Sequence, residues 1–110
     1  MGNKDDSYYL NKALIDIDAI IRYTRNLSYD EFIDDEKVID SVMFRLIQLI
    51  ENIKNISDNF KQEHSKVPWG KIMGFRNGIV HEYGSTDYST VYEIVSKNIY
   101  ELKDLFERNL

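Results

Sequence analysis

Apolar positions along the chain recur at spacings of three and four residues, the period of an α-helix packed on one side. Early in the chain they form one row on a single helix face: Leu10, Leu14, Ile17 and Ile21. This row predicts a helix over about residues 7–25. Ser28 and Glu31 follow with the spacing of a capping box, which predicts that a short helix begins there.

The middle of the chain carries two neighbouring apolar rows, which predict a long helix over about residues 36–62. The first row is Val42, Leu46, Leu49, Ile53, Ile56 and Phe60. The second row is Ile39, Met43, Ile47 and Ile50. The two rows fit either a central helix surrounded by its own chain or a helix that also contacts a second subunit.

Two more helices are expected in the last part of the chain. Pro68 suits the first turn of a helix, because its missing N–H has no partner there, and this helix should run to about residue 81 or 83. Asp87 is a good N-cap and predicts a last helix over about residues 88–108. Its apolar stripe is Val91, Val95, Ile99, Leu102 and Phe106. The sequence thus predicts an all-α, up-and-down bundle of four main helices with one short additional helix, in a single domain over residues 1–110.

Composition narrows the possible chemistry. The 110 residues are 43% hydrophobic and 30% charged, which suits a small soluble helical protein. The chain has no cysteine, which excludes disulfides, thiolate metal sites and cysteine nucleophiles and fits a reducing cytosol. Its two histidines lie far apart and predict no metal site. No apolar run is long enough to span a membrane, so we expect a cytoplasmic protein. We also expect it to need no metal or other cofactor.

The net charge of -5 argues against a general nucleic-acid coat, but the charge is unevenly distributed. Only residues 61–82 carry a positive excess, with four basic and two acidic side chains. The basic ones are Lys61, Lys66, Lys71 and Arg76. This segment predicts a local basic site on an acidic body, able to accept a phosphate chain in a salt-sensitive way.

The basic segment ends in a short set of reactive side chains: Arg76, Asn77, His81 and Tyr83. Arginine grips phosphate with a planar fork of donors, and histidine exchanges protons at cellular pH. On a helix, His81 lies about 140° from Arg76 and shares a face with Asn77. RNA cleavage needs a base, an acid and a cation, which one histidine and one arginine cannot easily supply. Two copies related by a two-fold axis could, so the motif also predicts a homodimer.

The spacing of these residues also fits a purely structural set. His81 would then cap the helix end, Arg76 would pair with Glu82, and Tyr83 would pack against neighbours. The other histidine, His64, lies in a polar connection and is expected to be solvated.

The residues of the motif resemble those of a known family. Arg76-Asn77 followed by His81-Glu82-Tyr83 matches the R-X4-H-X-Y pattern of HEPN domains, specifically the HepT-like toxins. The resemblance extends over nearly the whole chain, in order, through these further segments: 27–32, 67–69, 72–77, and Asp87 with 91–94.

The resemblance implies a HEPN fold and a ribonuclease toxin of a type VII toxin–antitoxin pair. Such proteins are homodimeric, metal-independent endoribonucleases that cleave RNA, such as tRNA or mRNA, in a cleft between subunits. The resemblance makes Arg76 and His81 catalytic and Asn77 a supporting residue. It also implies a partner, a minimal nucleotidyltransferase (MNT-type antitoxin), that adds AMP from ATP to Tyr83 and silences the toxin.

Two other functions fit the same sequence. In the first, the chain is a non-catalytic HEPN binding subunit of a two-component nucleotidyltransferase, and its acidic charge and small size favour this function. In the second, the chain is a plain helical dimerisation protein, in which changing Arg76 or His81 alters only stability.

Overall fold

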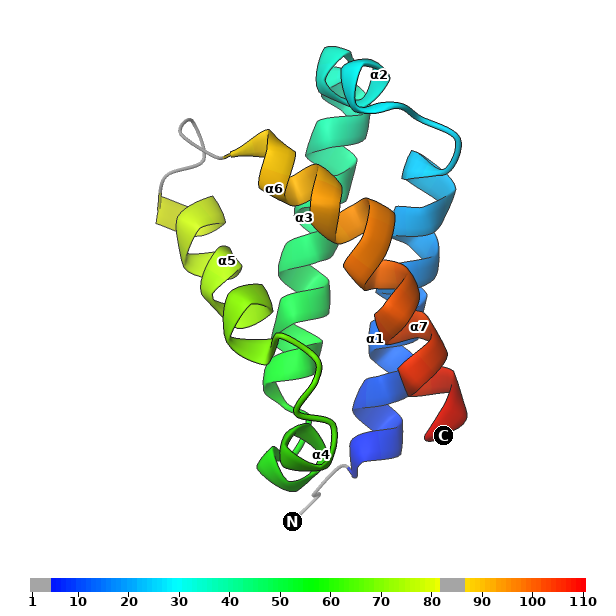
Figure 1. The fold of residues 1–110 in the computed structure, drawn as a ribbon, viewed down its shortest axis with the longest axis vertical. Coiled ribbons are helices and arrows are strands. Elements are labelled where there is room, and N and C mark those ends of the chain that lie inside the picture. The colour runs from blue at the N-terminus through cyan, green and yellow to red at the C-terminus, as the bar shows by residue number, and fades with distance from the viewer. Residues whose placement is uncertain (1–4, 82–86) are drawn as a thin grey trace.

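The computed structural model describes residues 5–81 and 87–110, and at residues 76–81 it describes the backbone alone. Within these ranges every regular element is a helix, and the all-α prediction is confirmed (Figure 1). None of the helices in the described part of the chain has the length and apolar content needed to cross a membrane.

The first three helices begin within about one residue of the starts that the sequence predicts. Helix α1 spans Asp6–Thr24, α2 spans Tyr29–Asp34 and α3 begins at Glu36. The predicted capping box before α2 is present. The Glu31 N–H donates to the Ser28 hydroxyl at 3.2 Å, and the Ser28 N–H donates to the Glu31 carboxylate at 2.9 Å.

The prediction of one unbroken helix over residues 36–62 is wrong. Helix α3 spans Glu36–Lys54, and a separate helix α4 spans Asp58–Glu63. Ser57 causes the break. Its hydroxyl accepts from the Phe60 N–H at 3.1 Å, while its own N–H and hydroxyl donate to the Asp6 carboxylate at 2.8 and 2.7 Å. These bonds give the backbone an alternative to helix continuation.

The C-terminal half contains α5 (Trp69–His81), α6 (Tyr88–Glu93), a π-helical segment η2 (Ile94–Asn98) and α7 (Ile99–Arg108). The last three elements follow one another without a break and form one continuous helical rod, the α6–α7 rod (Figure 1). This agrees with the predicted helix over residues 88–108, except that the π-helical turn widens its middle. The predicted apolar stripe of this rod is buried: Val91, Val95, Ile99, Leu102 and Phe106.

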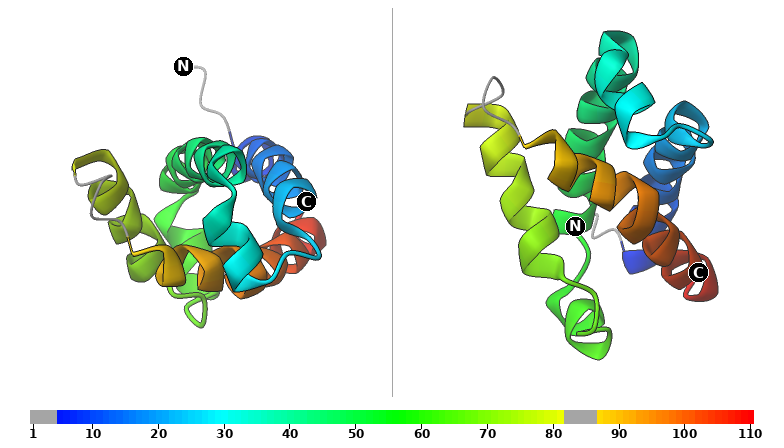
Figure 2. Two further views of the ribbon diagram at one scale, coloured as in Figure 1. Left: turned by 90° about the horizontal axis from the view of Figure 1, so that it is seen from above. Right: turned by 45° about the horizontal axis from the view of Figure 1, so that its top comes forward.

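Helices α1 and α3 lie side by side in opposite directions, with the α6–α7 rod across them and α5 along α3 (Figures 1 and 2). The two apolar rows of α3 both pack inside this arrangement, with only Ile47 half-buried. Of the two interpretations of these rows, the structure supports the central helix within its own chain. The rows therefore no longer argue for a second subunit.

Candidate catalytic site on helix α5

Helix α5 carries three of the four predicted site residues on its backbone: Arg76, Asn77 and His81. The side chains of residues 76–81 are not described, and Tyr83 lies outside the described residues. Positions 76, 77 and 81 lie on one helix, as expected from the helix predicted from about residue 68 to residue 81 or 83.

The two candidate catalytic positions lie on different sides of α5. Ile72, 3% exposed, marks the side that packs on the core. At 100° per residue, position 76 lies about 40° from Ile72, and position 81 lies about 180° from it. Position 81 instead shares its side of the helix with Gly70 and Gly74. An added Cβ at either glycine would have no described atom within 4 Å, apart from its two chain neighbours and the local helix backbone.

The N-terminal end of α5 is anchored by Trp69. Its indole N–H donates to the carbonyls of Lys61 and His64, each at 3.1 Å. Its ring stacks on Phe106 of α7, with centroids 6.4 Å apart and an interplanar angle of 9°. The helix that carries the motif is thus held by α4 and α7 at its beginning, far from position 81.

An ion pair joins α5 to the following helix. The Lys71 ammonium donates to the Glu93 carboxylate of α6, and this hydrogen bond and charge lower the pKa of Glu93. One of the four cations in the predicted basic segment is therefore paired within the protomer. The sequence did not predict this contact, because Glu93 lies 22 residues further along the chain.

Hydrogen bonds to Asp87 hold the beginning of α6. Asp87 caps α6 as predicted, accepting from the backbone N–H groups of Ser89 and Thr90 at 3.0 and 3.4 Å. The hydroxyls of the same two residues donate to its carboxylate at 2.6 and 3.0 Å. These four hydrogen bonds, above all those from the hydroxyls, lower the pKa of Asp87.

Among the side chains that the structure describes, those of residues 5–75 and 87–110, no group of three or more histidines, aspartates or glutamates is placed to hold a metal ion. His64 differs from its expected solvated state. It is half-buried at the end of α4, its ring centroid lies 4.5 Å from that of Phe60, and it lines a pocket at the opposite end of α5 from the motif. The sequence did not predict this pocket.

Comparison with known proteins identifies the family of the chain. The family model of "Ribonuclease HepT-like" proteins matches residues 13–108. A protein of Caldanaerobacter subterraneus named "Putative RNase TTE0752" is 33% identical over 96 residues, covering 86% of this chain and 85% of its own. "Putative RNase MJ1216" of Methanocaldococcus jannaschii is 32% identical over 109 residues, covering 98% and 89%.

A third relative carries the family name itself. "Probable ribonuclease HepT" of Thermococcus cleftensis is 30% identical over 100 residues, covering 91% of each chain. No solved structure matches the chain. Because the family model spans most of the sequence and relatives above 30% identity cover nearly all of it, this chain belongs to the HepT-like ribonuclease family.

Proposed function

We propose that the protein is a metal-independent endoribonuclease, formed by one domain over residues 1–110, with Arg76 and His81 as its catalytic residues. The observation that carries the proposal is the match to a ribonuclease family across residues 13–108, a range that contains the whole R-X4-H-X-Y motif. Asn77, four residues before His81 on the same helix, supports the histidine.

The chemistry uses the 2′-hydroxyl of RNA as the nucleophile. A histidine removes the proton from this hydroxyl, and the oxygen attacks the adjacent phosphorus. The bond from phosphorus to the 5′-oxygen then breaks, and that oxygen receives a proton from a second histidine. The products are a 2′,3′-cyclic phosphate and a free 5′-hydroxyl. Arg76 stabilises the negative charge that develops on the phosphate oxygens.

This chemistry favours a site shared between two copies of the chain. Each protomer offers one motif histidine, while base and acid roles need two. The backbone register adds a second reason, since positions 76 and 81 lie about 140° apart on α5. A two-fold axis beside α5 brings two such helices together and supplies both histidines and both arginines to one cleft.

Regulation follows from the motif tyrosine. Tyr83 is the acceptor of AMP from a cognate minimal nucleotidyltransferase antitoxin, which makes this cytoplasmic protein the toxin of a toxin–antitoxin pair. Transfer forms a bond from the phenol oxygen to the α-phosphorus of ATP and releases pyrophosphate. The added phosphate repels the RNA backbone and the adenosine fills the cleft.

The decisive experiment is an RNA cleavage assay with purified protein and chelator present, using tRNA and mRNA. Wild type should cleave and His81→Ala should lose at least a hundredfold in rate. His64→Ala is the matched control, because it removes the only other histidine, and it should cleave like wild type. No cleavage by wild type, or equal cleavage by His81→Ala, would refute the proposal.

A second candidate is a non-catalytic binding subunit of a two-component nucleotidyltransferase. The net charge of -5 and the pairing of Lys71 with Glu93 favour it, since both weaken attraction for RNA. In that case the chain co-purifies with the nucleotidyltransferase and does not inhibit growth when expressed alone.

A further inference from the structure

A small pocket of about 160 Å³ lies where the end of α1 meets the middle of the α6–α7 rod (Figure 1). Two segments line it. The first is residues 24–27, which end α1 and follow it, and the second consists of four residues of the rod: Tyr92, Val95, Ser96 and Tyr100. The two segments are joined directly, because the Tyr92 hydroxyl donates to the Leu27 carbonyl at 2.7 Å.

Three hydroxyl groups of this lining already donate within the protein. Besides the Tyr92 hydroxyl, the Thr24 hydroxyl donates to the Ile20 carbonyl at 2.8 Å, and the Ser96 hydroxyl donates to the Tyr92 carbonyl at 2.6 Å. The donors that remain belong to the other polar side chains of the lining: Arg25, Asn26 and Tyr100. None of these three side chains has a hydrogen-bond or ion-pair partner among the residues that the structure describes.

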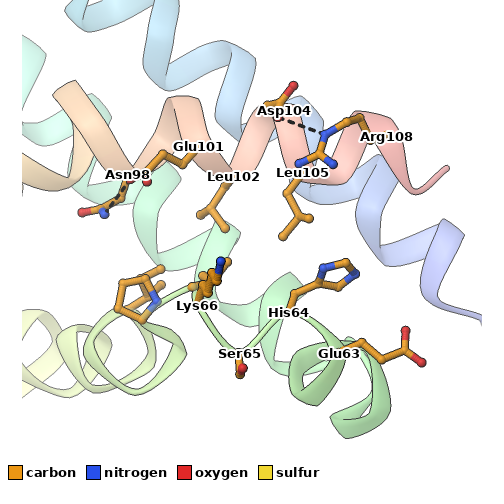
Figure 3. Close-up of a pocket in the computed structure, with 13 residues that line it drawn as sticks. Glu63, His64, Ser65, Lys66, Asn98, Glu101, Leu102, Asp104, Leu105 and Arg108 are labelled. Carbon is orange, nitrogen blue, oxygen red and sulfur yellow. Dashed lines mark hydrogen bonds and ion pairs between the residues drawn. The ribbon is translucent and has the colours of Figure 1, made fainter.

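The charge of this lining differs from that of the larger pocket around His64 and Asn98. In the larger pocket, three carboxylates lie beside a lysine, an arginine and a histidine (Figure 3). In the small pocket, Arg25 is the one charged residue among the lining residues that the structure describes. The carbonyl end of α1 contributes a partial negative charge, so the guanidinium is the group that attracts an anion. Its planar fork of donors suits a phosphate group.

An exposed aromatic ring lies at the same pocket. Tyr100 is 44% exposed, whereas Tyr92 packs against Tyr29 with ring centroids 5.5 Å apart. Proteins hold single-stranded RNA by combining basic side chains, which bind backbone phosphates, with aromatic rings, on which bases stack. An unpaired guanidinium and an exposed tyrosine at one small pocket provide both parts of this combination.

The rod connects this pocket to the region of the catalytic helix. The rod begins at Tyr88, after the segment that follows α5, and Ser96 lies about 12 Å further along it. We propose that the pocket is an accessory RNA contact, in which Arg25 binds a backbone phosphate and Tyr100 stacks on the neighbouring base. This inference rests on the proposed ribonuclease function, because it concerns how the substrate of that site is held.

The test measures RNA binding without cleavage. His81→Ala protein is titrated into a short, fluorescein-labelled single-stranded RNA, and fluorescence anisotropy gives the Kd. Adding Arg25→Gln should weaken binding about tenfold and reduce the slope of log K against log salt by about 0.7, because one phosphate contact is lost. Adding Tyr100→Leu should also weaken binding about tenfold but leave the slope unchanged, because stacking releases no counterions.

Arg22→Gln, in the same His81→Ala protein, is the matched control. Arg22 lies on the same helix, is exposed and does not line the pocket, so the same loss of charge should change the Kd by less than about twofold. Arg25→Gln keeps the backbone hydrogen bond from residue 25 to the Ile21 carbonyl, 2.9 Å, so the end of α1 is preserved. The proposal fails if Arg25→Gln leaves the Kd unchanged, or if Arg22→Gln weakens binding as much.

Cleavage with His81 intact separates this inference from the ribonuclease function. Arg25→Gln should raise KM about tenfold and change kcat by less than about twofold, because the contact is equally strong before and during reaction. If wild type cleaves RNA and Arg25→Gln leaves KM unchanged, the accessory contact is refuted and the ribonuclease function stands. If wild type does not cleave RNA, the ribonuclease function is refuted, and the anisotropy comparison still decides whether Arg25 and Tyr100 hold RNA.

Inorganic phosphate serves as a simpler ligand. Titrated into ¹⁵N-labelled protein, it should shift amide signals around the pocket with a Kd above about 1 mM, because it offers no base to Tyr100. A Kd far below this value, together with RNA binding that does not change in Arg25→Gln, would make the pocket a site for free phosphate and would overturn the proposal.

Discussion

A partly buried ion pair between α1 and α3 offers a sharp test of which contacts stabilise this fold. Asp16 is 5% exposed, and its carboxylate accepts from the Arg45 guanidinium at 3.1 Å and from the Asn52 amide at 2.9 Å. Arg45→Met removes the guanidinium and keeps most of the apolar stem. The Asp16 carboxylate then stays buried, and of these two donors it keeps only the Asn52 amide.

The size of the effect follows from the exposure of the two partners. Removing one member of a fully buried pair typically costs about 3–5 kcal/mol. Here the Arg45 side chain is 29% exposed and Asn52 remains, so water and one hydrogen bond offset part of the loss. We expect Arg45→Met to lower the free energy of unfolding by about 2–3 kcal/mol. The double variant Asp16→Leu with Arg45→Met has no buried charge and should regain at least half of that.

Urea unfolding followed by circular dichroism measures both values. Arg108→Met is the matched control, since it breaks a pair with Asp104 at a similar distance, 3.0 Å, but with side chains 65% and 70% exposed. It should change the free energy of unfolding by less than about 0.5 kcal/mol. The reasoning fails if Arg45→Met costs no more than this control, or if the double variant is less stable than Arg45→Met alone.

Two further predictions concern the elements on either side of the motif. Trp69→Phe removes the donor shared by the carbonyls of Lys61 and His64, so it should lower the free energy of unfolding, measured in urea, by about 1–2 kcal/mol. It should also speed amide hydrogen exchange in the first turns of α5, and unchanged exchange there would contradict the anchoring role. The folded-state pKa of Asp87 is lowered, so its contribution to stability is present above its unfolded pKa of about 3.9 and is lost as pH falls through the folded value. Asp87→Asn should therefore lose less thermal stability than wild type between about pH 4 and pH 2, and parallel pH profiles would refute this.

The helix faces and caps could be predicted because they depend on neighbours within four residues. The capping box at Ser28 and the buried stripe of the last helix both follow from local spacing, and the structure has both. The break at Ser57 could not be predicted, because Ile56 and Phe60 continue the apolar spacing through it. Its cause, the pair of hydrogen bonds to Asp6, joins residues 51 apart in the chain.

The candidate site shows the same division between local and distant contacts. Spacing and resemblance single out the motif, and spacing predicts the helix that carries it. The bounds of that predicted helix agree with those of α5. The pairing of Lys71 with Glu93 and the pocket around Asn98 depend on how α5 lies against α6 and α7, and no local pattern reports that arrangement. The apolar rows over residues 39–60 left two interpretations open, and packing within a single chain accounts for both rows.

The proposed shared cleft therefore depends on the motif rather than on the α3 surface, and subunit mixing tests it directly. If cleavage needs His81 from both protomers, a dimer with one His81→Ala chain is inactive. Unfolding and refolding equal amounts of wild type and His81→Ala together leaves about a quarter of the dimers fully wild type, so activity should fall to about a quarter of that of an all-wild-type sample at the same total chain concentration. Protomers that act independently would retain about half. Mixing with His64→Ala in the same way should leave activity unchanged. Retention of half of the activity after mixing with His81→Ala would place a complete site in each protomer, and the two-histidine mechanism would be wrong.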